Sequence, residues 1–143
     1  MENGGIMAAK NAAKDASRNE DWNSEALAAA NVGLWVIDID RNTGHISMLA
    51  NPVTLRLLGA SEEMTPAQCF NFWVDRVDAR SRPHLWAIHD EFIADTAMHE
   101  VRYQYNHPMW GLVPVRCGGR RISADHDDVV RVVGYHQDMT ELH

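Results

Sequence analysis

The pattern of hydrophobic and polar positions changes twice along this chain. Two short apolar runs, 33–39 and 45–49, flank the polar stretch 40–44, a pattern that predicts two strands joined by a turn. From residue 52 to about residue 97 the apolar positions recur at helical spacing. After Met98 they alternate, which predicts strands at 101–105, 110–122 and 129–137. The expected order is therefore two strands, a helical middle and three strands.

Proline marks the start of each helix predicted in the middle of the chain. The pairs Asn51-Pro52 and Thr65-Pro66 and the run Ser81-Arg82-Pro83 each place proline near the first helical position, where it costs no hydrogen bond. Gly59 ends the first of these helices. The third helix should be the longest, with one face formed by Leu85, Ile88 and Phe92. A further helix is predicted at 22–31, ahead of the first strand.

The length and composition indicate one soluble domain. The chain has 143 residues, of which 45% are hydrophobic and 23% charged, as in ordinary globular proteins. We expect residues 1–21 to form a polar, alanine-rich segment that is flexible or helical, and residues 22–143 to form a single domain. Cys69 and Cys117 have neither the number nor the spacing of a disulfide framework or a zinc site.

The charge and the hydrophobic runs limit the possible partners and location. A formal net charge of −7 disfavours binding to nucleic acid or to anionic lipid. No run approaches the roughly 18 apolar residues needed to span a membrane, and the first residues lack a signal-peptide core. We therefore expect a cytoplasmic domain that contacts neither nucleic acid nor membrane, although a longer parent protein could still contain a membrane segment.

Three stretches, in the right order, resemble parts of a PAS domain. GLWVIDIDRNTGHISML is similar to the opening hairpin of that family, and NPVTLRLLGAS is similar to the short helix that follows it. The closing DMTE resembles the Asp-Ile-Thr-Glu signature at the end of PAS domains. The resemblance covers roughly residues 24–143. It departs from the family before the long helix, where 77–82 replaces the frequent His-Pro-Asp-Asp-Arg step, so the capping of that helix should differ.

The resemblance implies an α+β fold and a sensory role. The fold would be a five-stranded antiparallel sheet with helices covering one face and a flanking helix at the N-terminal side. Such a module detects a small molecule or cofactor and does not catalyse a reaction. It would regulate a covalently linked output domain, such as a histidine kinase, a diguanylate cyclase or a phosphodiesterase, in two-component or cyclic-di-GMP signalling. Asp138, Thr140 and Glu141 would form the junction with that output domain, and we expect this chain to be one part of a longer protein.

His136 is the first candidate for a polar group inside the pocket. Alternation along the last strand places Val130, Val132, Gly134 and His136 on one face. Similarity to LOV domains, the flavin-binding branch, assigns this face to the pocket, because those domains carry a pocket glutamine two residues before the final aspartate. A histidine satisfied by neighbouring side chains or water is the alternative. The other pocket candidates are Trp35, Ile37, Met48, Cys69, Phe72, Trp73, Ile88, Tyr103, Val132 and Gly134.

The sequence disfavours both flavin and haem, and it leaves the cofactor unknown. Cys69 lacks the Asn-Cys-Arg-Phe-Leu-Gln context of LOV photochemistry, so it is interpreted as a small buried core residue. His84 and His89 lie on the predicted long helix, where haem-binding PAS domains have their ligand. Leu85, Ile88 and Phe92 occupy the inward face, so we interpret both histidines as solvated.

Two other polar clusters are interpreted as structural. The stretch 125–128, Asp-His-Asp-Asp, falls where a hairpin turn is expected, and consecutive turn residues do not converge on one metal ion. Gly118-Gly119 lacks the pattern of a phosphate loop and suggests a break or bulge in a strand.

Two alternatives to a ligand sensor remain open. The first is a PAS module without ligand, in which the helix at 22–30 packs beside the outer sheet face and pairs two chains. Without it, Leu34, Val36, Val133 and Tyr135 on that face would be exposed. The second is a small α+β enzyme, suggested only by eight histidines and the acidic turn, with no recognisable catalytic constellation.

Overall fold

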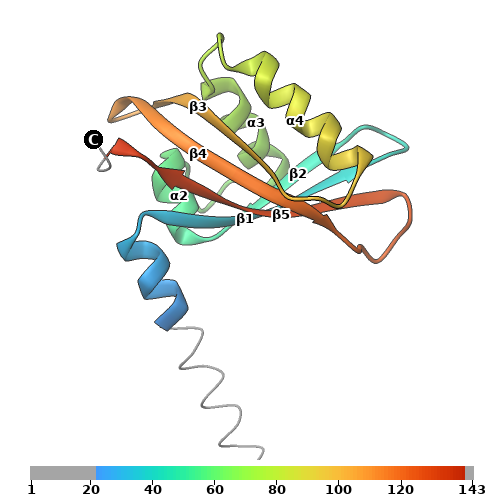
Figure 1. The fold of residues 1–143 in the computed structure, drawn as a ribbon. Coiled ribbons are helices and arrows are strands. Elements are labelled where there is room, and N and C mark those ends of the chain that lie inside the picture. Colours follow the sequence, from blue (N-terminus) through green and yellow to red (C-terminus); the bar gives the residue numbers. More distant parts are fainter. Residues whose placement is uncertain (1–21, 141–143) are drawn as a thin grey trace, which may run out of the picture. The chain divides into compact units, whose positions relative to one another are not determined.

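Five strands pair into one antiparallel sheet in the computed structural model, which describes residues 22–140 (Figure 1). The strands lie in the order β2-β1-β5-β4-β3. Their bounds are Val32–Asp40 for β1, Ile46–Ala50 for β2, His99–His107 for β3, Gly111–Ile122 for β4 and Val129–Asp138 for β5. The predicted order of two strands, helices and three strands is confirmed.

Three helices connect β2 to β3. They are α2 (Pro52–Leu58), α3 (Pro66–Arg76) and α4 (Arg82–Ala94). Figure 1 shows them gathered over one face of the sheet. A separate helix covers residues 22–29, and it belongs to a different unit of the chain, Met1–Ala30, than the sheet, which lies in Asn31–His143.

The helix starts follow the proline signals, but they are capped differently. The Asn51 side chain accepts a hydrogen bond from the Thr54 backbone N–H (3.0 Å) at the start of α2. Thr65 and Gln68 form a reciprocal capping box at the start of α3. Ser81 precedes α4 without any side-chain capping bond, as the departure from the family pattern suggested.

The inner face of the sheet and the helices enclose the core. Alternation along β5 buries Val130, Val132 and His136, so the predicted assignment of faces is correct. Helix α2 is tied to β1 by the fully buried Thr54, whose hydroxyl donates to the Leu34 carbonyl oxygen (2.8 Å). Helices α3 and α4 contribute buried aromatic and aliphatic side chains above the centre of the sheet.

The interpretation of Gly118-Gly119 as a break or bulge is wrong. Both residues lie in regular register, Gly118 opposite Tyr135 and Gly119 opposite Gly134. Side chains at two of these positions would meet the backbone and the Trp35 indole. A Cβ on Gly134 would lie 2.2 Å from the Gly118 carbonyl oxygen and 2.3 Å from the Trp35 ring, and a Cβ on Gly119 would lie 2.6 Å from the Val133 carbonyl oxygen and 2.9 Å from that ring. Gly119 and Gly134 therefore form a flat floor under Trp35.

Candidate functional site

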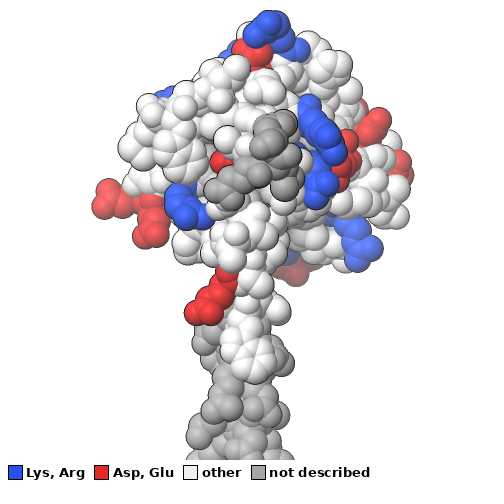
Figure 2. Space-filling view, turned by 60° about the vertical axis from the view of Figure 1, so that its left-hand side comes forward, with Lys and Arg blue, Asp and Glu red and all other residues white. Residues whose placement is uncertain are grey.

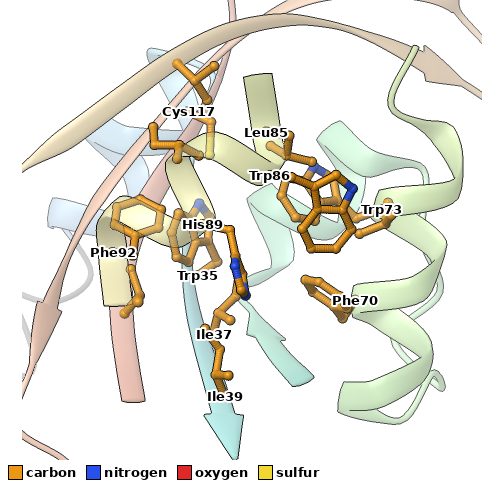
Figure 3. Close-up of a pocket in the computed structure, with 14 residues that line it drawn as sticks. Trp35, Ile37, Ile39, Phe70, Trp73, Leu85, Trp86, His89, Phe92 and Cys117 are labelled. Atoms are coloured by element: carbon orange, nitrogen blue, oxygen red, sulfur yellow. The ribbon is translucent and has the colours of Figure 1, made fainter. Parts of the chain in front are cut away.

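An apolar cavity lies between the inner face of the sheet and helices α3 and α4 (Figure 3). Its volume is about 40 Å³, enough for only a few water-sized molecules. The sheet contributes Trp35, Ile37, Ile39, Val101, Cys117 and Val132 to its wall. The helices contribute Phe70, Trp73, Val74, Leu85, Trp86, Ile88, His89 and Phe92. This wall favours an apolar occupant.

A second and smaller cavity lies beside the first. Its volume is about 10 Å³, close to the minimum for one water molecule. Four residues line only this smaller cavity: Met48, Thr54, Leu58 and His136. Both cavities are lined by Trp35, Ile37, Trp73 and Cys117. These four shared side chains separate the two spaces.

A buried hydrogen-bonded chain fixes the protonation of His136. The Trp73 indole N–H donates to the Tyr103 hydroxyl oxygen (2.7 Å), which leaves the Tyr103 hydroxyl to donate to Nδ1 of His136 (3.3 Å). Burial lowers the pKa of His136 to about 4, because the charged imidazolium would lose its hydration. A neutral ring that accepts at Nδ1 carries its proton on Nε2. Nε2 is buried and has no partner among the described residues, so His136 presents an unused donor beside the smaller cavity.

His89 is not the solvated histidine that the sequence suggested. It lines the larger cavity, only 25% of its side chain is exposed, and its Nε2 is buried without a partner in the described part of the chain. Figure 3 shows its ring among the cavity residues of the sheet and helices. The predicted inward face of α4 is correct, since Leu85 and Ile88 are buried and Phe92 lines the cavity. The cavity wall therefore includes His89, the residue after Ile88 on α4. His84 is exposed, as expected.

Both cysteines are buried thiols. Burial raises the pKa of Cys69 and brings that of Cys117 to about 12, because a thiolate is poorly solvated there. Cys69 is 3% exposed, which agrees with its interpretation as a core residue. Neither environment activates the sulfur as a nucleophile.

Other solved structures share this arrangement of strands and helices. A sensory box histidine kinase/response regulator from Burkholderia thailandensis matches with 18% identity and a TM-score of 0.60, covering 83% of this chain and 85% of that chain. The N-terminal domain of a diguanylate cyclase with PAS/PAC sensor from Marinobacter aquaeolei matches with 17% identity and a TM-score of 0.56, covering 77% and 99%. A PAS domain from Colwellia psychrerythraea matches with 16% identity and a TM-score of 0.60, covering 85% and 97%. The chain has the PAS fold. No family model and no curated protein matches its sequence.

Within this PAS fold, many of the predicted pocket residues come together. Five of them line the larger cavity: Trp35, Ile37, Trp73, Ile88 and Val132. Met48 and His136 line the smaller one. Tyr103 is buried and reaches the site through its bond to His136. Their contact with a ligand remains a prediction.

Three predicted residues lie elsewhere in the PAS fold. Gly134 is on the inner face, but the Trp35 ring fills the space above it. Cys69 is in the core without lining either cavity. Phe72 is half-buried, and the Arg76 guanidinium lies 4.4 Å from the centre of its ring. For Phe72, its position one residue before the buried Trp73 on α3 was the available signal that it points another way.

The cavity also includes residues that sequence reasoning missed. Phe70 lies one helical turn before Val74 on α3, so helical spacing could have joined the two to Trp73. Cys117 alternates with Val115 and Val113 on β4, all three of them buried, and strand alternation could have placed it inward. Trp86 carried no such signal, because it is 42% exposed while its ring still lines the cavity.

Charged side chains of both signs lie on the surface of the PAS fold (Figure 2). Residues 125–128 are exposed in the turn before β5, and the described residues contain no group of three or more potential metal ligands. Figure 2 shows basic and acidic side chains interspersed on the face that it draws. No helix in the described range 22–140 is long and apolar enough to cross a membrane.

The predicted output junction is only partly within the described residues. The Asp138 side chain accepts a hydrogen bond from the Thr140 N–H (2.8 Å), and the Met139 N–H bonds to the Pro114 carbonyl oxygen (2.9 Å). These bonds fix the direction in which the chain leaves β5. Glu141 lies outside the described residues.

Proposed function

We propose that this chain is a sensory PAS module that binds a small molecule between its sheet and helices and regulates a linked output domain. The observation that carries the proposal is the apolar cavity between the inner sheet face, α3 and α4. An empty space of about 40 Å³ costs a folded protein about 1 kcal/mol relative to a filled core. A ligand would offset that cost. No catalytic role is proposed.

Similar structures support the signalling half of the proposal. Two of the matching proteins are named as a sensory box histidine kinase and a diguanylate cyclase with PAS/PAC sensor. A PAS-B domain of Drosophila melanogaster Cycle was solved with bound ethylene glycol at 6% identity and a TM-score of 0.55. We propose a histidine kinase, diguanylate cyclase or phosphodiesterase as the output domain, reached through Asp138, Thr140 and Glu141, and a cytoplasmic location.

The size of the cavity sets the class of ligand. A flavin or a haem is far larger than either cavity, so it could enter only if the wall side chains moved apart. The wall offers aromatic and aliphatic surface and two unused imidazole nitrogens. We therefore propose a small and mainly apolar ligand.

Filling the cavity provides the test. Val132 lines it from β5, and Val133 is the next residue on the opposite face of the strand. Val132→Leu adds one methylene to the wall and should remove most binding of small organic probes. Val133→Leu is the matched control and should bind them as the wild type does. Thermal shifts and NMR titrations with a fragment library measure both, and equal binding by Val132→Leu would count against this site.

An assembly module without ligand is the second candidate. The outer face of the sheet exposes large apolar side chains, with Leu34 44%, Leu49 62% and Met98 53% accessible. They surround a broad hollow that Val36, Val133 and Tyr135 also line. A patch of this kind favours a protein partner, and we propose a second copy of the chain. Both roles can coexist, because they use opposite faces of the sheet.

A further inference from the structure

His89 lies between the enclosed cavity and an open hollow at the surface. An open hollow of about 520 Å³ lies beneath the β1–β2 turn, bounded by Asp40, Arg41 and Gly44 on one side and by Ile93 on the other. Ile39 and His89 are the two residues that line both this hollow and the enclosed cavity. The partial exposure of the His89 ring fits this position, because one edge reaches the hollow while Nε2 is buried.

The surroundings of His89 fix the role of its two nitrogens. Nδ1 lies 3.4 Å from a carboxylate oxygen of Asp90, and an ionised carboxylate can only accept a hydrogen bond. Nδ1 therefore carries the proton and donates, which leaves a lone pair on Nε2. That lone pair is buried, has no partner among the described residues, and lies in a wall that is otherwise apolar. A buried acceptor without a partner is costly, so a donor that reaches it gains affinity.

The cavity volume limits how the ligand can lie. About 40 Å³ holds a short apolar chain and little more. A polar group buried deeper among Trp35, Phe70 and Phe92 would lose its hydration without a partner. Such a group is satisfied only beside His89, where Nε2 can accept its hydrogen bond.

From this geometry we infer that the ligand is a slender, neutral molecule with an apolar end in the cavity and a hydroxyl or N–H group that donates to Nε2 of His89. The inference rests on the proposed function and adds the class of ligand to it. It also distinguishes the two imidazoles of the site, since His136 offers a donor beside the smaller cavity and His89 offers an acceptor in the wall of the larger one.

Three probes of equal heavy-atom count test the inference on the full chain. They are 1-butanol, which can donate a hydrogen bond, and methyl propyl ether and 2-butanone, which can only accept one. We expect 1-butanol to bind about three- to tenfold more tightly than either of the others, the range of a single net hydrogen bond. Dissociation constants come from NMR titration of the backbone amides around the cavity.

Three variants assign that preference to His89. His89→Leu should abolish the preference for the alcohol, while His89→Gln, whose side-chain oxygen can accept, should restore part of it. His84→Leu, an exposed histidine on the same helix, is the control and should keep the full preference. A preference that survives in His89→Leu, or tighter binding of 2-butanone than of 1-butanol to the wild type, overturns the inference.

The outcomes also separate this inference from the proposed function. If all three probes bind equally and Val132→Leu weakens all of them, the cavity is a binding site but His89 is not its acceptor. If none of the probes binds the wild type at concentrations below denaturation, the small-molecule function itself fails.

Discussion

His136 is a buried base, and its burial couples the stability of the fold to pH. Its pKa is about 4 in the folded protein and about 6.5 in an unfolded chain. Between these values the unfolded state binds more protons, so the free energy of unfolding rises with pH. The full stability is present above about pH 6.5. We expect a loss of about 3 kcal/mol from this residue as the pH falls to about 4.

The variant His136→Gln isolates this contribution. Its side-chain oxygen can still accept the Tyr103 hydrogen bond, but it does not titrate. Urea unfolding between pH 4 and pH 7.5 should show a stability difference between wild type and variant that changes with pH. His84→Gln, exposed on α4, is the control and should follow the wild-type curve. An NMR titration of His136 near pH 6.5 would contradict the prediction.

The two histidines at the cavity show how far single residues can be placed from sequence. Strand alternation placed His136 on one face of β5 with Val130 and Val132, and the resemblance to LOV domains assigned that face to the pocket. His89 could not be placed in the same way. Helical spacing puts its side chain 100° around α4 from that of Ile88. Whether that direction faces solvent depends on the distance between α4 and the β1–β2 turn, and this distance cannot be predicted from a local sequence pattern.

At the scale of elements, the different capping of α3 and α4 predicts how substitutions at their N-termini change the free energy of unfolding. Thr65 accepts from the Gln68 N–H at 3.2 Å within a capping box, whereas Ser81 makes no capping bond to α4. Thr65→Ala should therefore lower the free energy of unfolding by about 1 kcal/mol. Ser81→Ala, the matched control, removes only a long hydrogen bond from the Gln104 N–H (3.4 Å) and should cost clearly less. Chemical denaturation measures both, and equal losses would show that capping is not the cause.

The ends of helices could be predicted from the sequence where a single residue, such as proline or glycine, determines the local backbone conformation. Proline at the helix starts and Gly59, with its left-handed φ of 71°, placed the ends of α2 and the beginnings of α3 and α4. The regular pairing of Gly118 and Gly119 was not accessible in this way. Glycine in a strand is ambiguous between a bulge and a close approach. Groups distant in the sequence decide between them: Tyr135 and Met98 approach Gly118, and the Val133 carbonyl oxygen and the Trp35 ring approach Gly119.

At the scale of the molecule, the inner and outer faces of the sheet differ in how much space and apolar surface they leave open. The inner face is nearly filled, and Trp35, lying across Gly119 and Gly134, takes up volume that a larger ligand would need. The outer face is open and apolar in the region of β1 and β2. An apolar ligand on the inner face and a second chain on the outer face would therefore not compete for the same surface. Trp35 lines the hollows on both faces.

The outer face leads to a prediction about assembly. Leu49 is 62% exposed on β2 and pairs across the sheet with Val36 on β1. If this face joins two copies, Leu49→Glu places a charge in the interface and should shift the full chain from dimer to monomer while leaving its unfolding midpoint nearly unchanged, because a solvated glutamate costs little in the isolated chain. Met109→Glu is the matched control, since Met109 is 79% exposed in the turn between β3 and β4 and away from this face. Light scattering over a concentration series measures the mass. A wild type that stays monomeric, or a dimer that persists in Leu49→Glu, would rule out this surface as the interface and leave the cavity as the functional site of the fold.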